Sequence, residues 1–379
     1  MRFCVRRSFY LLILLCLLAA CSEAGSALPT MQPLPTNQAQ PAVDETQATQ
    51  IVVENQSNVP GKLLFVRVEN GSGDIWVHEG TEARRITTSH KKYQPSWSPD
   101  GSKIAYIQRE ESFADIWVMN ANGSNKQQVT NNEPTNIAAR SEDHIQTLRW
   151  AFYPRWSPDG QFLSYVSQAQ TPRDVGGGYQ EYPLSLYIYG TRRIGTGQFP
   201  EASFQRFVQA DTDLSHPTWS DDGTMIVYSQ AERCFGCEAA EIQLGYAVLD
   251  LPGGNDEYGV LQGPSEDTFK GAIDPSFSPD GKWLTFTKSE NGYSDVFIVP
   301  APDTNGKVRS APIKLTSTGR SRQATWSPDG TKLAFFTISD QVTLSIADLT
   351  IEGSTPSLSQ PVDIRRDLFD VDSGMSWAK

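Results

Sequence analysis

Residues 95–101 read Pro95-Ser96-Trp97-Ser98-Pro99-Asp100-Gly101, and close copies of this heptad recur along the chain. The four further complete copies are Pro154-Arg155-Trp156-Ser157-Pro158-Asp159-Gly160, Pro217-Thr218-Trp219-Ser220-Asp221-Asp222-Gly223, Pro275-Ser276-Phe277-Ser278-Pro279-Asp280-Gly281 and Ala324-Thr325-Trp326-Ser327-Pro328-Asp329-Gly330. A last copy, Met375-Ser376-Trp377, ends after its aromatic residue. Five near-identical heptads and one partial copy predict a fold built from equivalent units.

Each heptad has the composition of a tight turn between two β-strands. Proline fixes a backbone angle suited to a type I turn, aspartate caps the turn, and glycine accepts the positive φ needed to enter the next strand. An alternating apolar stretch follows each heptad, as in Lys103-Ile104-Ala105-Tyr106. We therefore expect β-hairpins in which the motif aromatics are packing wedges, namely Trp97, Trp156, Trp219, Phe277, Trp326 and Trp377. A structural role in the turns, rather than a catalytic one, is assigned to Asp100, Asp159, Asp222, Asp280 and Asp329 and to Gly101, Gly160, Gly223, Gly281 and Gly330.

Further strands complete each unit. Asp115-Ile116-Trp117-Val118 and Asp295-Val296-Phe297-Ile298 predict a third strand, and pairs such as Val129-Thr130 and Leu315-Thr316 predict a fourth. A sheet of about four short strands buries both faces only between neighbouring copies, which is typical of a propeller blade. The motif aromatics are 49 to 63 residues apart, more than the roughly 40 to 45 residues of a minimal blade. Several connections are therefore expected to be long.

The two ends of the repeat region complement each other. The last copy lacks its later strands, whereas Lys62-Leu63-Leu64-Phe65-Val66 and Asp74-Ile75-Trp76-Val77, with Ile86-Thr87, precede the first heptad. Strands from both ends are expected to share one blade, because this closes the ring and removes the open sheet edges. The prediction is an all-β, six-bladed β-propeller over residues 61–379.

At these heptads the sequence resembles the Trp-Ser-Pro-Asp-Gly repeat of TolB-type six-bladed propellers, which are distant relatives of WD40 proteins. The resemblance covers residues 61–379, with mild departures at Asp221, which replaces Pro, and Phe277, which replaces Trp. It implies the propeller fold and a general tendency to bind proteins. TolB carries an N-terminal α/β domain before its propeller, whereas a lipid tether is predicted here, so membership of the Tol-Pal complex does not follow.

Residues 1–20 have the features of a bacterial lipoprotein signal peptide. Arg2, Arg6 and Arg7 precede an apolar run of about ten residues, too short to span a bilayer as a helix, and Leu18-Ala19-Ala20-Cys21 resembles a lipobox. We expect diacylglycerol on Cys21, and acyl chains there would anchor the protein stably. Residues 21–60 lack a strand or helix period and are predicted to be a disordered tether. The expected location is extracytoplasmic, on the cell membrane or the outer membrane.

Charge and cysteine content narrow the classes of partner. Without the three arginines of the signal, 29 basic and 44 acidic residues remain, a net charge of −15. A surface this acidic disfavours nucleic acids. Cys234 and Cys237 remain after processing and are predicted to form a small disulfide loop, because export favours oxidation and no second cysteine pair for zinc exists. A monomer is expected.

Signals for catalysis are weak. The sequence has no Gly-x-Ser-x-Gly elbow, and none of its four histidines, His78, His90, His144 and His216, has another at metal-ligand spacing. His216 precedes the third heptad and is expected in a surface or loop role. No catalytic residue, metal or cofactor is predicted. The hypothesis is a non-catalytic platform that binds an envelope protein, peptide or glycan; the alternative is a metal-dependent lactonase-like or lyase-like enzyme with ligands scattered around the central channel.

Three stretches between the repeats are candidates for the binding surface. Residues 131–152 and 167–214 are long for propeller connections, and the second is rich in glycine and aromatic residues. Its aromatics either contact a partner or cover the blade, and the sequence favours neither. Residues 231–240, which include Cys234 and Cys237, are the third candidate stretch.

Overall fold

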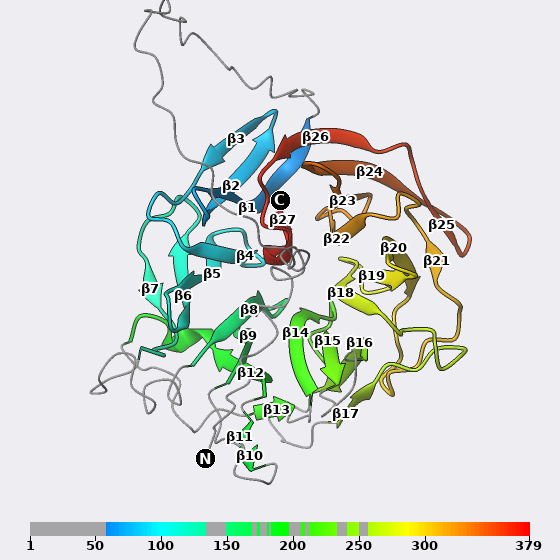
Figure 1. Cartoon of the computed structure of the whole chain (residues 1–379), viewed down its shortest axis with the longest axis horizontal. Helices are drawn as coiled ribbons and strands as arrows, with labels where there is room; N and C mark the ends of the chain where they lie inside the picture. The colour runs from blue at the N-terminus through cyan, green and yellow to red at the C-terminus, as the bar shows by residue number, and fades with distance from the viewer. Residues whose placement is uncertain are drawn as a thin grey trace, which may run out of the picture. The chain divides into compact units, whose positions relative to one another are not determined.

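The computed structural model describes residues 58–133, 149–168, 173–174, 180–181, 183–196, 206–208, 212–232, 241–249 and 257–379. Six antiparallel sheets are arranged as blades around a central axis (Figure 1). The prediction of an all-β, six-bladed propeller is therefore confirmed. Within these ranges, no helix has the length and apolar character needed to cross a membrane.

The blades are numbered along the chain, and each is given from its innermost strand outward. Blade 1 contains β27 (Ser376–Ala378), β1 (Val59–Glu69), β2 (Ser72–Gly80) and β3 (Glu82–Arg85). Blade 2 contains β4 (Lys92–Trp97), β5 (Lys103–Arg109), β6 (Ala114–Asn120) and β7 (Gln127–Gln128). Blade 3 contains β8 (Ala151–Trp156), β9 (Phe162–Ser167), β12 (Ser185–Gly190) and β13 (Arg206–Val208).

The remaining three blades follow the same plan. Blade 4 contains β14 (Thr212–Trp219), β15 (Met225–Glu232), β16 (Ile242–Val248) and β17 (Glu257–Val260). Blade 5 contains β18 (Ala272–Phe277), β19 (Trp283–Glu290), β20 (Tyr293–Pro300) and β21 (Ile313–Lys314). Blade 6 contains β22 (Ser321–Trp326), β23 (Lys332–Ile338), β24 (Val342–Glu352) and β26 (Val362–Asp367), and β25 (Thr355–Leu358) pairs with the end of β24. Outside the blades lie the strand pair β10 (Arg173–Asp174) and β11 (Gln180–Glu181) and the short 3₁₀ helices η2 (Thr191–Arg193) and η3 (Val371–Ser373).

Both ends of the repeat region contribute to blade 1. Strand β27 pairs with β1, so that Leu63 lies opposite Trp377 (Figure 1). The indole N–H of Trp377 also donates to the Pro60 carbonyl oxygen at 2.6 Å. The predicted blade shared by the N-terminal and C-terminal strands is confirmed, and it closes the ring.

The heptads form the turns between the first two strands of blades 2 to 6. In each turn the serine hydroxyl donates to an aspartate oxygen at 2.5–2.6 Å, as from Ser98 to Asp100. Asp100 also accepts the Ser102 N–H, at 3.0 Å. The glycine that follows has φ between +65° and +72° in all five heptads, a conformation that side chains disfavour.

The motif tryptophans connect neighbouring blades. The indole N–H of Trp97 donates to the Lys62 carbonyl oxygen of blade 1 at 3.0 Å. Equivalent bonds reach from Trp156, Trp219 and Trp326 to the carbonyl oxygens of Ser96, Arg155 and Ser276 in the preceding blade. Phe277 has no N–H, so this bond is missing between blades 4 and 5.

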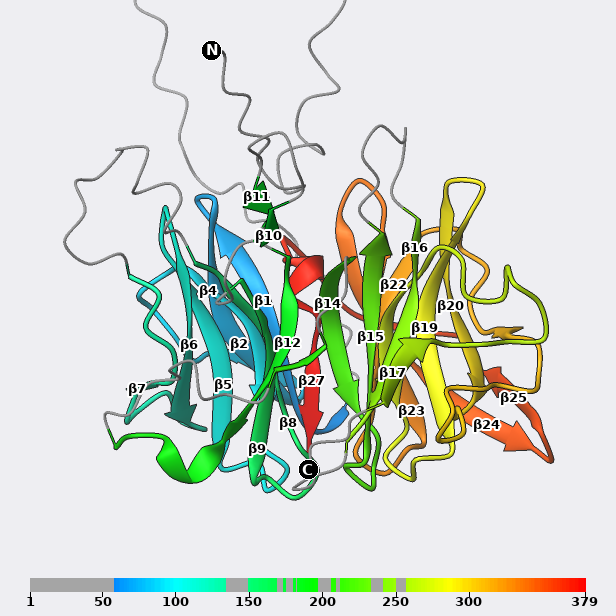
Figure 2. The same cartoon turned by 90° about the horizontal axis from the view of Figure 1, so that it is seen from below.

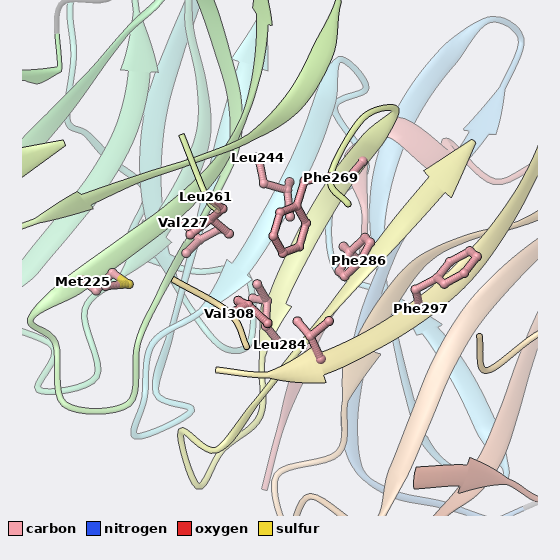
Figure 3. Close-up of a cluster of buried hydrophobic side chains, with 11 residues drawn as sticks. Met225, Val227, Leu244, Leu261, Phe269, Leu284, Phe286, Phe297 and Val308 are labelled. Carbon is pink, nitrogen blue, oxygen red and sulfur yellow. The ribbon is translucent and has the colours of Figure 1, made fainter. Parts of the chain in front are cut away.

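Apolar side chains fill the spaces between blades. Figure 3 shows the cluster between blades 4 and 5, where Val227 and Leu244 face Phe286 and Phe297. Burial of such faces is the main favourable term in folding, at about 25 cal/mol per Å² of apolar surface. A single blade leaves both faces uncovered, so the blades depend on one another for stability.

Three blades contain a buried aspartate in the third strand that is hydrogen-bonded to a threonine just after the fourth strand. The Thr130 hydroxyl donates to Asp115 at 2.8 Å, and equivalent bonds join Thr87 to Asp74 and Thr316 to Asp295. Lys314 forms an ion pair with Asp295, at 2.8 Å, whereas the neutral Gln128 occupies the corresponding position beside Asp115. Burial raises the pKa of Asp115 from about 3.8 to about 6.

Replacing Gln128 with lysine is expected to change the pH dependence of stability. Because the folded-state pKa of Asp115 is raised, the folded state holds this proton more tightly than the unfolded state. The resulting stabilisation is complete below about pH 4 and is lost as the pH rises through about 6, by about 3 kcal/mol. The lysine introduced by Gln128→Lys would stabilise the ionised carboxylate of Asp115. The free energy of unfolding should then no longer fall as the pH rises through about 6.

Urea unfolding between pH 4 and 7 measures the effect. Asp115→Asn is the control, because it removes the titrating group and should give the same flattened profile. A Gln128→Lys profile that kept the wild-type slope would contradict the assignment.

Candidate functional site: a polar ring at the channel mouth

Five equivalent residues of the innermost strands, and one residue just before the innermost strand of blade 1, lie directly before the heptad positions. Five are Gln94, Tyr153, His216, Asp274 and Gln323, and the sixth is Gly374. All six have positive φ, between +49° and +64°. In blades 2 to 6 the strand register shifts at this point, as between Tyr93 and Ser96, which marks a β-bulge. We call these six residues the channel-mouth ring.

The side chains of the ring connect each blade to the next. The Gln94 side-chain oxygen accepts the Tyr153 N–H at 2.6 Å, and the Tyr153 and His216 rings lie 4.2 Å apart. His216 Nε2 is 3.5 Å from Asp274 Oδ1, which accepts a hydrogen bond from Gln323 Nε2 at 2.9 Å. A non-glycine residue with positive φ costs on the order of 1 to 3 kcal/mol, and such strain is concentrated at functional sites.

Helix η3 completes the circuit. The Ser373 hydroxyl accepts the Gln94 N–H at 3.1 Å, and a methyl group added to Gly374 would lie 3.0 Å from the Gln323 side-chain oxygen. Contacts therefore pass through all six blades and back to the first, so the ring encloses the axis. Figures 1 and 2 show η3 in the centre of the propeller, near one end of the channel, with the C-terminus at the other end.

Two arginines bring positive charge to the ring. Arg322 Nη2 lies 3.5 Å from both Asp274 and Asp372. Arg155 donates to the carbonyl oxygen of its neighbour Pro154 at 3.0 Å, and its Nη2 would lie 3.8 Å from a methyl group added to Gly374. Arg155 thus extends from blade 3 to the axial segment of blade 1.

Several donors of this cluster lack an acceptor among the residues that the structure describes. Neither ring nitrogen of His216 makes a hydrogen bond, nor does Arg322 Nε, although all three atoms are buried. No described carboxylate lies within ion-pair distance of Arg155. Burial lowers the pKa of Arg155 to about 10, so it remains charged at neutral pH, and burial also lowers the pKa of His216. Buried polar groups without partners are rare and call for an explanation such as a ligand.

The donor set favours an anion. Arginine binds carboxylates through paired N–H groups, and low solvent exposure strengthens such bonds. Within the described ranges, no three His, Cys, Asp or Glu side chains lie close enough to hold a metal ion. The Arg322 guanidinium beside Asp274 and the charged Arg155 of the same cluster also repel a cation.

The sequence analysis did not identify this ring. It placed His216 in a surface or loop role, and this was wrong: His216 lies in strand β14 with its side chain 13% exposed. The available signal was the polar residue before the heptad in four of the five complete copies, Gln94, His216, Asp274 and Gln323. The strand bulge that brings these residues together was not predicted.

Several predicted features lie outside the described residues: the signal peptide, Cys21, the tether up to residue 57, and the Cys234–Cys237 pair. The stretch 167–214 is not one loop, because it includes β12 and β13 of blade 3 and the start of β14. Tyr187 and Tyr189 in this stretch are buried in the core between blades 2 and 3. For these two aromatics, covering the blade is the correct alternative.

Comparisons with known proteins agree with this architecture. The family model for the dipeptidyl peptidase IV N-terminal region matches residues 59–172. An uncharacterized peptidase of Bacillus subtilis, YuxL, is 26% identical over 231 residues, which are 53% of this chain and 30% of the relative. The Tol-Pal system protein TolB of Anaeromyxobacter dehalogenans is 25% identical over 79 residues, 20% of this chain and 18% of the relative. The chain thus spans less than a third of either of these relatives.

A solved structure decides the fold type. The crystal structure of TolB from Acinetobacter baumannii superposes with a TM-score of 0.52 at 18% identity, over 84% of this chain and 66% of TolB. The fold is that of a TolB-type propeller. Relatives of this TolB-type propeller include a protein named as a peptidase and a Tol-Pal system protein, so the fold alone does not determine whether it catalyses a reaction.

Proposed function

We propose that this protein is a non-catalytic, membrane-tethered extracytoplasmic module that binds a carboxylate of a protein or peptide partner at the channel-mouth ring. The observation that carries the proposal is the convergence of three groups: Arg322 Nε and the His216 ring, which are buried without a hydrogen bond, and the charged Arg155, which has no described carboxylate within ion-pair distance. A partner carboxylate would supply the acceptors that these groups lack. The Tol-Pal system protein among the relatives supports a protein partner.

Several strands end beside the channel-mouth ring. Strand β9 ends at Ser167 and β12 begins at Ser185. These two residues lie opposite each other, and Ser167 also lies opposite Ala151, at the ring end of β8. Strand β15 likewise ends next to Thr212, at the ring end of β14. The long connections that start from these strand ends therefore leave and re-enter the blades on the same face as the ring. We propose that they contribute to the binding surface.

Arg155→Met is expected to weaken partner capture at least about tenfold. Methionine keeps much of the side-chain length but removes the charge, and loss of one member of a buried, hydrogen-bonded charge pair costs about 2 to 5 kcal/mol. The purified protein and the variant are compared by pull-down from solubilised envelopes. Surface plasmon resonance with a peptide bearing a free C-terminal carboxylate, and with its C-terminal amide, tests the ring directly.

The control is Arg309→Met, because the Arg309 side chain is 84% exposed and pairs only loosely with Asp303, at 3.9 Å. Capture by this variant should equal that of the wild type. Equal binding of the free carboxylate and the amide, or full capture by Arg155→Met, would exclude the ring as the site.

We propose that acylated Cys21 holds the propeller at the membrane. Cys21→Ala removes the thiol that would receive diacylglycerol, so the protein is expected to move almost completely from the membrane fraction to the soluble fraction. Labelling with a radioactive fatty acid should disappear as well. Cys16→Ala, within the predicted signal, should change neither result, and a membrane-bound, labelled Cys21→Ala protein would overturn the assignment. The Cys234–Cys237 disulfide remains a proposal of the same kind, testable by thiol counting before and after reduction.

A further inference from the structure

A small pocket opens beside the channel-mouth ring, between blades 5 and 6. Its volume is about 320 Å³, and its lining residues are Ser294, Gly319, Arg320, Arg322, Ile338 and Ser339. We call it the Arg320 pocket. All six residues are half-buried or exposed, so the pocket is open to solvent. Its volume is at the lower end of the range of about 300 to 1,000 Å³ that is typical of ligand sites, which suits a single side chain.

Backbone hydrogen bonds between the two blades hold the walls of the Arg320 pocket. The Ser294 N–H donates to the Gly319 carbonyl oxygen, and the Ile338 N–H donates to the Arg320 carbonyl oxygen, each at 2.9 Å. Arg322 belongs to both sites, because it lines the pocket and also pairs with an aspartate of the channel-mouth ring. The pocket and the ring therefore meet at one guanidinium group.

Two arginines give the Arg320 pocket positive charge. Arg320 and Arg322 are two residues apart in an extended segment, so their side chains leave the backbone on the same side. Arg322 Nη2 lies 3.5 Å from both Asp274 and Asp372, but its Nε is buried without a hydrogen bond. Arg320 is exposed, and none of the described carboxylates lies within ion-pair distance of it. The charge of Arg320 is therefore unbalanced, although the whole chain has a net charge of −12.

Apolar surface lies next to this charge. Ile338 is half-buried and lines the pocket. The Tyr293 ring lies against Gly319, since a methyl group added to this glycine would be 2.9 Å from Tyr293 Cδ1, and Tyr293 is nevertheless 64% exposed. Tyrosine and arginine are enriched among the residues that supply most of the binding energy of protein interfaces. A side chain with an apolar stem and an anionic end matches this combination, and glutamate is such a side chain.

We propose that the Arg320 pocket binds a glutamate side chain of the same partner whose carboxylate binds the channel-mouth ring. This inference rests on the proposed function and specifies the partner further. The glutamate carboxylate would pair with Arg320, and its methylene groups would contact Ile338. Because Arg322 lines both sites, the two carboxylates of the partner must lie close together. The partner is therefore expected to end in acidic residues, with its C-terminal carboxylate at the ring.

The test uses two short N-acetylated peptides that have a free C-terminal carboxylate and differ only in carrying glutamate or glutamine at their last two positions. Surface plasmon resonance measures their affinity for the whole protein. The wild type is expected to bind the glutamate peptide about threefold to fivefold more tightly, which is the effect of one exposed ion pair. Arg320→Met should lose this preference and bind the glutamine peptide as the wild type does.

The matched control is Arg309→Met, which removes an exposed arginine that does not line the pocket and should keep the preference for glutamate. Arg155→Met should weaken the binding of both peptides and leave the ratio of their affinities unchanged. Equal affinity of the wild type for the two peptides, or a preference that Arg320→Met retains, would overturn this proposal and leave the ring proposal in place. Absence of binding by both peptides would overturn the two proposals together.

Discussion

Truncation of the chain after Gly374 is expected to unfold the propeller under conditions in which the full chain is folded. The deletion removes β27, and with it the buried residues Met375 and Ala378, the Trp377 indole, and the partner of Lys62–Leu64 in blade 1. Loss of buried Met and Trp side chains costs about 2 to 5 kcal/mol each. The whole free energy of unfolding of a domain is only about 5 to 15 kcal/mol.

The Ser376 hydroxyl adds to this effect, because it accepts the Trp97 N–H at 2.9 Å and so joins blade 1 to blade 2. Circular dichroism during urea unfolding measures the loss. Removal of Lys379 alone is the control, since this residue is exposed, and it should leave the unfolding midpoint unchanged. If the longer truncation also kept the wild-type midpoint, closure of the ring by β27 would not stabilise the fold.

The second large effect is expected at Asp274. This carboxylate is 3% exposed, accepts a hydrogen bond from Gln323 and lies 3.5 Å from both Arg322 and His216. Asp274→Ala would leave the Arg322 guanidinium with only the Asp372 carboxylate, whose side chain is 58% exposed. Breaking a buried ion pair by removing one partner costs about 3 to 5 kcal/mol. We expect a loss of about 3 kcal/mol in the free energy of unfolding.

The matched control is Asp348→Ala. Asp348 pairs with Lys332 on the surface, and its side chain is 61% exposed. Exposed pairs contribute about 0 to 1 kcal/mol, so this variant should unfold close to the wild type. Equal unfolding midpoints for the two variants would show that the ring contacts of Asp274 do not stabilise the fold.

Substitutions of Asp274 and Arg155 should therefore affect different properties of the protein. Asp274 has partners within the protein, so its loss should reduce stability. Arg155 has no described carboxylate partner, so Arg155→Met should change stability by little and reduce binding instead. A variant pair with the opposite behaviour would assign the structural role to Arg155.

The heptads predicted the strands and turns because their physics is local. Pro99, Asp100 and Gly101 act within one hairpin, through a fixed backbone angle, a side-chain hydrogen bond and a positive φ. Five copies and one partial copy then fixed the number of blades, and the missing strands at one end matched the spare strands at the other. Closure through β27 and β1 could be predicted for that reason.

The channel-mouth ring could not be predicted from such local patterns. Gln94, Tyr153 and His216 are separated by about sixty residues each, yet they touch, because the bulges turn their side chains toward a common axis. The His216 environment was predicted wrongly since nothing near it in the sequence reports Asp274 or Arg155.

The amino-acid sequence by itself determined the blade, the blade number and the way the ring is closed, because each depends on interactions within a hairpin or on a repeat that can be counted. The tertiary structure alone decided which polar contacts form at the axis. These depend on residues from different blades, and only the closed ring brings such residues within bonding distance.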